Sequence, residues 1–179
     1  MQLNEEMDMQ RLLRGFLIVF ALSGESQAMM EADKFIGAWR LVSAEFRNET
    51  GLAVESPYGK EPYGILIYDA QGAMSAQLSQ GGRKPFAADD RLGASNDEVR
   101  GAFESYQAYA GKFSVDEKAR VVIHSVTMAL VPNRIGTELR REYEFKDGRL
   151  ILRTPPTTIG GKRLRGELVW ERIKIGKPW

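Results

Sequence analysis

The 179-residue sequence contains no cysteine, so it excludes disulfides, thiolate catalysis and metal sites built on cysteine. His124 is its one histidine, which excludes a metal site with several histidine ligands. The sequence also lacks a D-x-D-x-D-G calcium loop, and we expect neither a metal nor a cofactor. An excess of one charge is missing too: 25 Lys and Arg balance 24 Asp and Glu. This balance argues against a nucleic-acid partner.

Long hydrophobic runs are also lacking. The apolar run at residues 16–22 is too short to span a membrane as a helix. Arg11 and Arg14 precede it, and the small residues Ser26 and Ala28 follow it, which is the layout of a secretory signal peptide. The acidic residues before position 9 do not suit a signal peptide, unless translation begins at a later methionine.

We therefore expect residues 1–28 to be a signal peptide, or else a helical or disordered N-terminal extension, and residues 29–179 to form one domain. With a signal peptide the protein would be periplasmic or secreted; without one it would be cytoplasmic. The mature protein is expected to have no membrane span.

The domain contains short β-rich runs separated by turn residues. Asp147-Gly148 is the strongest hairpin turn, and a second hairpin is predicted around residues 69–72. The other predicted strands cover residues 39–46, 112–115, 121–130, 137–145, 150–154 and 164–173.

One helix interrupts this pattern. Ser95 and Glu98 form a capping box, and Gly111 is the predicted end of the helix. We expect the helix to pack against the β-structure through an apolar stripe formed by Val99, Ala102, Phe103, Tyr106 and Ala110.

Alternation along the predicted strands indicates which side chains face inward. It places Arg141 and Tyr143 on the apolar face of residues 137–145, and His124 and Met128 on the bulkier face of residues 121–130. Strands with one apolar face and a single helix favour a closed antiparallel β-barrel of eight to ten strands. Such a barrel holds packed side chains or one small ligand.

Five segments occur in order between about residues 35 and 173: GAWRLVSAE, PYGILIYDAQGAMSAQ, YQAYAGKFSV, VIHSV and LVWER. Together they resemble the bacterial and fungal lipocalin-like domain family. The resemblance implies an all-β, lipocalin-like (calycin) barrel with one flanking helix. It also implies that Gly37 and Trp39 begin the first strand and that Arg172 lies across the Trp39 indole. The T-D-Y motif of other lipocalins is missing, so their ligands are not implied.

Arg141 is the sharpest candidate for a ligand contact, because an inward guanidinium must be paired or hydrated. It would bind a ligand carboxylate, or else form an internal ion pair with Glu45, which the alternation also places inward. His124 would transfer protons, orient a ligand carbonyl or serve as a satisfied core histidine.

Further candidates are aromatic or sulfur-containing. They either line a cavity or belong to the core and rim: Tyr68, Tyr106, Tyr109, Tyr143 and Met128. No serine or cysteine nucleophile stands in a recognisable motif, so no catalytic triad is assigned.

The leading functional hypothesis is a non-enzymatic carrier or sensor that binds a small, mainly apolar molecule in the barrel. The alternative is an isomerase or cyclase acting on a polyketide- or terpenoid-like substrate, which the cavity would hold in a reactive shape. The third hypothesis is a structural or interaction module that has a filled interior and binds no small ligand. The sequence decides neither enzymatic activity nor the oligomeric state.

Overall fold

The computed structural model describes residues 31–90, 92–174 and 176. The predicted signal peptide, residues 1–28, lies outside the described residues. The chain divides into two compact units, Met1–Phe35 and Ile36–Trp179, and all the strands among the described residues belong to the second. None of the described helices combines the length and the apolar character needed to cross a membrane.

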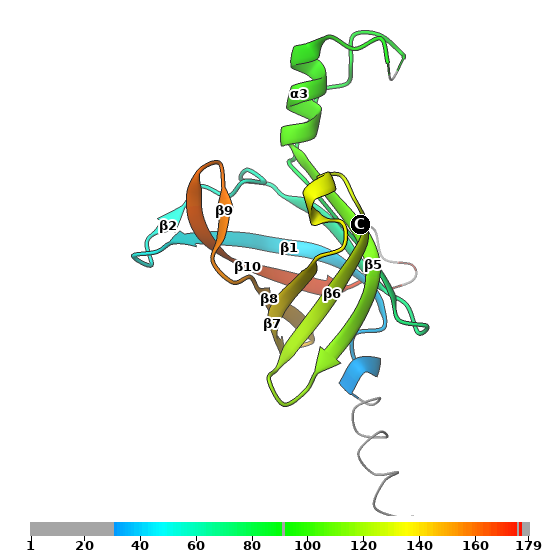
Figure 1. The fold of residues 1–179 in the computed structure, drawn as a ribbon, viewed down its shortest axis with the longest axis vertical. Coiled ribbons are helices and arrows are strands. Elements are labelled where there is room, and N and C mark those ends of the chain that lie inside the picture. The colour runs from blue at the N-terminus through cyan, green and yellow to red at the C-terminus, as the bar shows by residue number, and fades with distance from the viewer. Residues whose placement is uncertain (1–30, 91, 175, 177–179) are drawn as a thin grey trace, which may run out of the picture. The chain divides into compact units, whose positions relative to one another are not determined.

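The second unit is a closed antiparallel β-barrel (Figure 1). Eight strands form the ring in the order β1-β3-β4-β5-β6-β7-β8-β10, and β10 pairs with β1 to close it. Two short strands, β2 (Ala53–Val54) and β9 (Thr157–Ile159), extend the sheet beside β1 and β10. The ring strands are β1 (Gly37–Asn48), β3 (Tyr63–Tyr68), β4 (Ala73–Ser79), β5 (Tyr106–Asp116), β6 (Val121–Ala129), β7 (Glu138–Lys146), β8 (Arg149–Arg153) and β10 (Lys162–Arg172).

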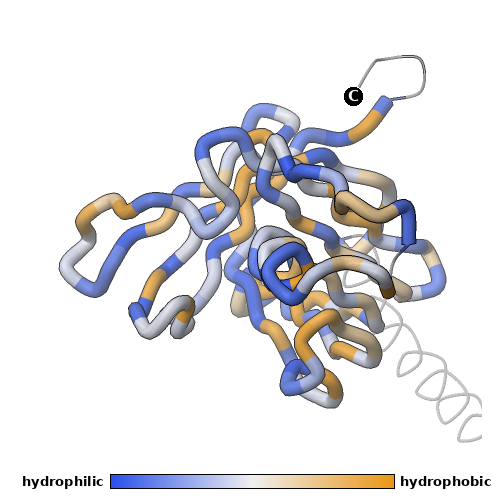
Figure 2. The backbone as a smooth tube through the Cα atoms, turned by 90° about the horizontal axis from the view of Figure 1, so that it is seen from above, coloured by the Kyte–Doolittle hydropathy of each residue, from blue (hydrophilic) through white to orange (hydrophobic). Residues whose placement is uncertain are grey.

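Alternation of apolar and polar residues along the eight ring strands explains the closure, because each ring strand turns one face toward the interior. Figure 2 shows hydrophobic and hydrophilic segments alternating along the chain. The inward faces form a core that includes Leu66, Leu78, Val122, Val126, Leu150 and Leu152. The predicted all-β, closed antiparallel barrel of eight to ten strands is confirmed.

The seam between β1 and β10 carries the cation–π contact that the resemblance implied. Trp39 is opposite Arg172 in the ladder, and the Arg172 Cζ atom lies 4.2 Å from the centroid of the buried indole. Such a contact contributes about 0.5–2 kcal/mol. Arg172 Nη1 also donates to the Ile36 carbonyl. Gly37 leaves room for this guanidinium, since a Cβ atom there would lie 2.5 Å from Nη1 and the residue has φ +132°.

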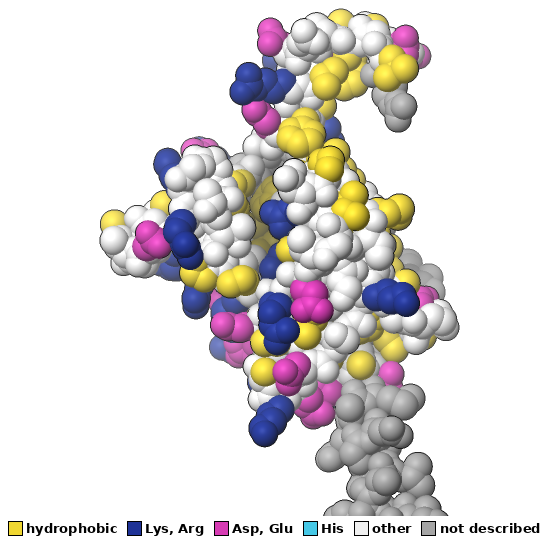
Figure 3. Space-filling model, viewed as in Figure 1, with side chains coloured by type: hydrophobic (Ala, Val, Ile, Leu, Met, Phe, Trp, Pro, Cys, Tyr) yellow, Lys and Arg dark blue, Asp and Glu magenta, His cyan; other side chains and the backbone are white. Residues whose placement is uncertain are grey.

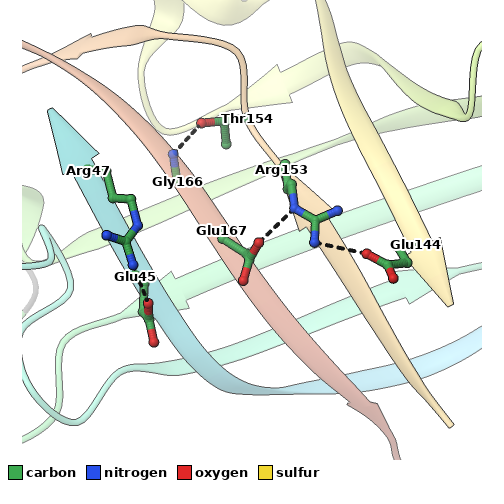
Figure 4. Close-up of polar contacts among 7 residues, drawn as sticks. All are labelled: Glu45, Arg47, Glu144, Arg153, Thr154, Gly166 and Glu167. Atoms are coloured by element: carbon green, nitrogen blue, oxygen red, sulfur yellow. Dashed lines mark hydrogen bonds and ion pairs between the residues drawn. The ribbon is translucent and has the colours of Figure 1, made fainter. Parts of the chain in front are cut away.

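A β-bulge in β1 changes the expected position of Glu45. The pairing with β10 shifts between Leu41 and Ser43, so Leu41 and Ala44 are both buried although they are three residues apart. Glu45 therefore points outward, where its Oε2 lies 3.7 Å from Arg47 Nη2 (Figure 4). The predicted inward Glu45, and with it the Arg141–Glu45 ion pair, is wrong.

On the same outer surface, a small ion network joins three strands (Figure 4). Arg153 of β8 donates to Glu144 of β7 at 2.9 Å and to Glu167 of β10 at 2.6 Å. All three side chains are partly exposed, so each pair contributes at most about 1 kcal/mol.

The helix α3 (Asn96–Glu104) begins at the predicted capping box but ends earlier than expected. Ser105 caps its C-terminus, and Tyr106 already belongs to β5, where it pairs with Ser79 of β4. Residues 106–110 thus satisfy their backbone groups in a sheet ladder instead of a helix. None of the residues of α3 is buried, and the helix extends away from the barrel in Figure 1. The expected packing of its apolar stripe against the sheet is wrong: Val99 is 49% and Phe103 48% exposed.

A second bulge, between β5 and β6, corrects two further predictions. Ala110 pairs with Met128 but Gly111 pairs with Val126, so β6 contains one extra residue at this point. The inward alternation ends there, and Met128 is 65% exposed instead of inward-facing. Gly111 is not a helix stop: a Cβ atom at this position would overlap the Ser125 carbonyl oxygen.

Candidate binding site

A cavity of about 270 Å³ lies in the barrel. This volume is near the lower end of the range for small-molecule sites, which suits a ligand about the size of a single aromatic ring. Figure 3 shows the surface hollowed between the β9–β10 side and the side of β6 and the short helix η1 (Pro132–Arg134), with Lys and Arg side chains beside the hollow. The apolar part of the wall includes Leu66, Ala76, Leu78, Leu152, Leu168 and Trp170.

The polar part of the wall is concentrated on β5, β6 and β7. Tyr109, His124 and Arg141 line the cavity together. His124 pairs with Leu139 in the β6–β7 ladder, and Arg141 pairs with Val122, so the two polar residues are diagonal neighbours on the inner face. The alternation of inward and outward residues along β6 and β7 therefore places the side chains of His124 and Arg141 at one site.

His124 is buried between two tyrosine hydroxyl groups. Its Nε2 lies 2.7 Å from Tyr68 Oη, and its Nδ1 lies 3.1 Å from Tyr109 Oη. The side chain is 1% exposed, and burial together with the nearby charge of Arg141 lowers the pKa of His124 to about 3. The imidazole is therefore neutral at pH 7, with one nitrogen donating and the other accepting.

Arg141 also acts on the Tyr109 hydroxyl group. Burial raises the pKa of Tyr109, while the charge of Arg141 and a hydrogen bond from it act in the opposite direction. The neutral imidazole has one donor nitrogen and one acceptor nitrogen, so one of the two tyrosine hydroxyl groups donates to His124 and the other accepts from it.

Tyr58 and Gln107 extend the polar wall. The Tyr58 hydroxyl donates to Gln107 Oε1 at 2.8 Å, and burial raises the pKa of Tyr58 to about 12. Arg134 also borders the cavity, from η1. The sequence offered no signal for these three residues, because Tyr58 lies in an irregular segment, Arg134 lies in the three-residue helix η1, and Gln107 was assigned to the α-helix.

The sequence-predicted residues are in different places. Arg141, His124 and Tyr109 are in the wall, and Tyr68 supports His124 from behind it. Three others are outside the wall: Tyr143 is buried beneath Arg120, Tyr106 donates to Gln77 on the barrel's outer face, and Met128 is exposed.

Trp170 adds an unusual feature to the wall. Its side chain is 2% exposed, and its Nε1 is buried without a hydrogen-bond partner among the described residues. Buried N–H groups normally have an acceptor, so this one requires an explanation. The sequence alone gives no sign that this nitrogen is buried without a partner.

Residues 31–90 and 92–174 contain no cluster of three or more carboxylate or imidazole side chains that could hold a metal ion.

Comparison with known proteins assigns the family. The profile of the lipocalin-like domain matches residues 36–173. The chain belongs to the lipocalin-like domain family. It is also similar to the 4'-hydroxy-3'-methoxypropiophenone carrier protein ppsC of Aspergillus oryzae, with 35% identity over 107 residues. That alignment covers 56% of this chain and 96% of the relative. Family membership and this relative together support small-molecule binding by this lipocalin-like protein.

Proposed function

We propose that this lipocalin-like protein is a non-enzymatic carrier or sensor that binds a single-ring, mainly apolar molecule, of the aryl ketone class, in its barrel cavity. The observation that carries the proposal is the cavity of about 270 Å³, with a largely apolar wall and one polar cluster at Tyr109, His124 and Arg141. Such a wall combines apolar burial with a few orienting contacts. The name of the Aspergillus relative supports the ligand class.

The state of His124 favours a carrier over an enzyme. A general base works best with a pKa near the operating pH, whereas the pKa of His124 is lowered to about 3. Both of its ring nitrogens are also engaged by tyrosines. The alternative, an isomerase or cyclase, draws its support from the hydrogen-bonded chain of Tyr109, His124 and Tyr68, which would move a proton to or from a substrate. Conversion of a bound ketone to a product would favour that alternative.

A cavity-filling substitution tests the proposed function. Ala76 is a buried wall residue of β4, and Ala76→Phe would place a phenyl ring in the ligand's space. We expect 4'-hydroxy-3'-methoxypropiophenone and related single-ring ketones to bind the wild type, and the variant to bind them at least about tenfold more weakly. Isothermal titration calorimetry measures both affinities.

Ser75→Phe is the matched control, because Ser75 is the preceding residue of β4 and lies outside the cavity wall. It should bind like the wild type, and circular dichroism should show all three proteins folded. Equal binding by Ala76→Phe, or no uptake of any such ketone by the folded wild type, would refute the proposed function.

A further inference from the structure

We propose that the cavity selects a ligand with a negatively charged oxygen, and that Arg141 makes this selection. The inference rests on the proposed function and adds a requirement to its single-ring ligand: an ionisable oxygen, either of a phenol bound as phenolate or of a carboxylate.

Charge in the cavity wall is the first argument. The wall contains the guanidinium groups of Arg134, Arg140 and Arg141 but only one carboxylate, that of Glu138. Glu138 is more than half exposed and is 3.9 Å from Arg140. Within the part of the chain that the structure describes, neither Arg134 nor Arg141 forms an ion pair. The wall therefore has excess positive charge, and a ligand anion would balance it.

Hydrogen-bond donors also outnumber free acceptors. The Tyr109 hydroxyl group is already hydrogen-bonded to His124, and the Gln107 oxygen already accepts from Tyr58. Arg141, in contrast, has five N–H groups, and its Nη1 donates to the Arg140 carbonyl at 2.9 Å. The Trp170 Nε1 is a further buried donor without a partner among the described residues. A ligand oxygen that accepts several hydrogen bonds complements this wall.

The guanidinium of Arg141 already acts on the ionisable groups around it. Its charge favours the phenolate forms of Tyr58, Tyr68 and Tyr109, although burial keeps the pKa of each hydroxyl raised. A ligand phenol beside Arg141 would experience the same attraction, and an opposite charge within about 4–6 Å lowers an acid's pKa by about 1–3 units. The other ionisable or charged groups facing this position are Tyr58, Tyr109, His124, Arg134, Glu138 and Arg140.

A pair of ligands that differ in one methyl group tests the inference. 4'-Hydroxy-3'-methoxypropiophenone ionises at its phenol, whereas its 4'-O-methyl ether cannot; 4-propylbenzoate supplies the carboxylate. We expect the phenol or the carboxylate, or both, to bind the wild type at least about tenfold more tightly than the ether at pH 8. The longer-wavelength absorption of the phenolate should show the pKa of the bound phenol lowered by about one unit or more.

Substitutions at Arg141 assign the effect. Arg141→Gln should reduce the preference over the ether to less than about threefold and remove the pKa change, and Arg141→Lys should retain part of both because it keeps the charge. Arg149→Gln, on the exposed part of β8 and outside the cavity wall, removes the same charge and should behave like the wild type. Thermal denaturation shows whether each variant is folded.

Two failures are distinguishable. If the wild type binds the ether as tightly as the phenol and the carboxylate, and Ala76→Phe abolishes binding of all three, the anion inference is overturned while the proposed function stands. If the folded wild type binds none of the three ligands, the proposed function fails as well.

Discussion

Acidification from pH 7 to pH 4 is expected to cost the folded protein about 3 kcal/mol through His124 alone. The pKa of this buried imidazole is lowered from 6.5 to about 3, because burial and the charge of Arg141 both oppose its protonation. The unfolded chain therefore binds a proton as the pH falls below about 6.5, while the folded protein remains unprotonated at this site until about pH 3. The free energy of unfolding therefore falls as the pH decreases from about 6.5 to about 3, and His124 does not change it above that range.

His124→Gln isolates this contribution. Glutamine keeps one donor and one acceptor for Tyr68 and Tyr109 but does not titrate. Carboxylates, including Glu98 with its lowered pKa, titrate in both proteins, so their effects cancel in the comparison. Urea unfolding at pH 7 and pH 4 should show a loss about 3 kcal/mol larger in the wild type. Equal losses would show that His124 is not a buried neutral imidazole.

Gly111→Ala is expected to destabilise the barrel by about 3 kcal/mol or more. Gly111 lies in the middle of β5, between Met74 of β4 and Val126 of β6, at the bulge where β6 contains an extra residue. A Cβ atom here would overlap the backbone carbonyl of Ser125. Because the overlapping atom belongs to the backbone, the clash can be removed only by moving the paired strands β5 and β6 apart. Chemical denaturation should show the loss of stability as a lower midpoint concentration of denaturant.

Gly101→Ala is the control with the opposite expected sign. Gly101 lies in α3, and a Cβ atom at this position would point into open space. Alanine should therefore stabilise the protein by up to about 1 kcal/mol through its higher helix propensity. If Gly111→Ala were as stable as Gly101→Ala, the close approach of β5 and β6 at the bulge would be disproved.

The barrel could be predicted from the sequence because it depends on local patterns. Apolar alternation fixes the inner face of most strands, and Asp147-Gly148 turns with positive φ at both residues, as its hairpin requires. The Trp39–Arg172 contact followed from the family resemblance. His124 and Arg141 were predicted inward because the inner and outer positions of β6 and β7 alternate without interruption around them.

The wrong predictions share a physical cause. They concern features that depend on how two strands pair, which the sequence of one strand does not show. The bulges in β1 and between β5 and β6 turned Glu45 and Met128 outward, and they depend on the pairing of two distant strands. The helix ends at Glu104 because the backbone from Tyr106 onward pairs with β4 in the sheet. The spacing of apolar residues beyond Glu104 still fits a helix, so the sequence pattern did not show this end. Tyr58 lines the cavity from an irregular segment and Arg134 from the three-residue helix η1, and neither segment is long enough in a regular pattern to guide a prediction.

A crystal structure of the protein with 4'-hydroxy-3'-methoxypropiophenone tests the central claim most directly. The account predicts the aromatic ring inside the barrel, against the wall that includes Ala76, Leu152 and Trp170, with its phenolic oxygen within hydrogen-bond distance of the Arg141 guanidinium. An interior closed by side chains, or a ligand bound only on the outer surface, would contradict it.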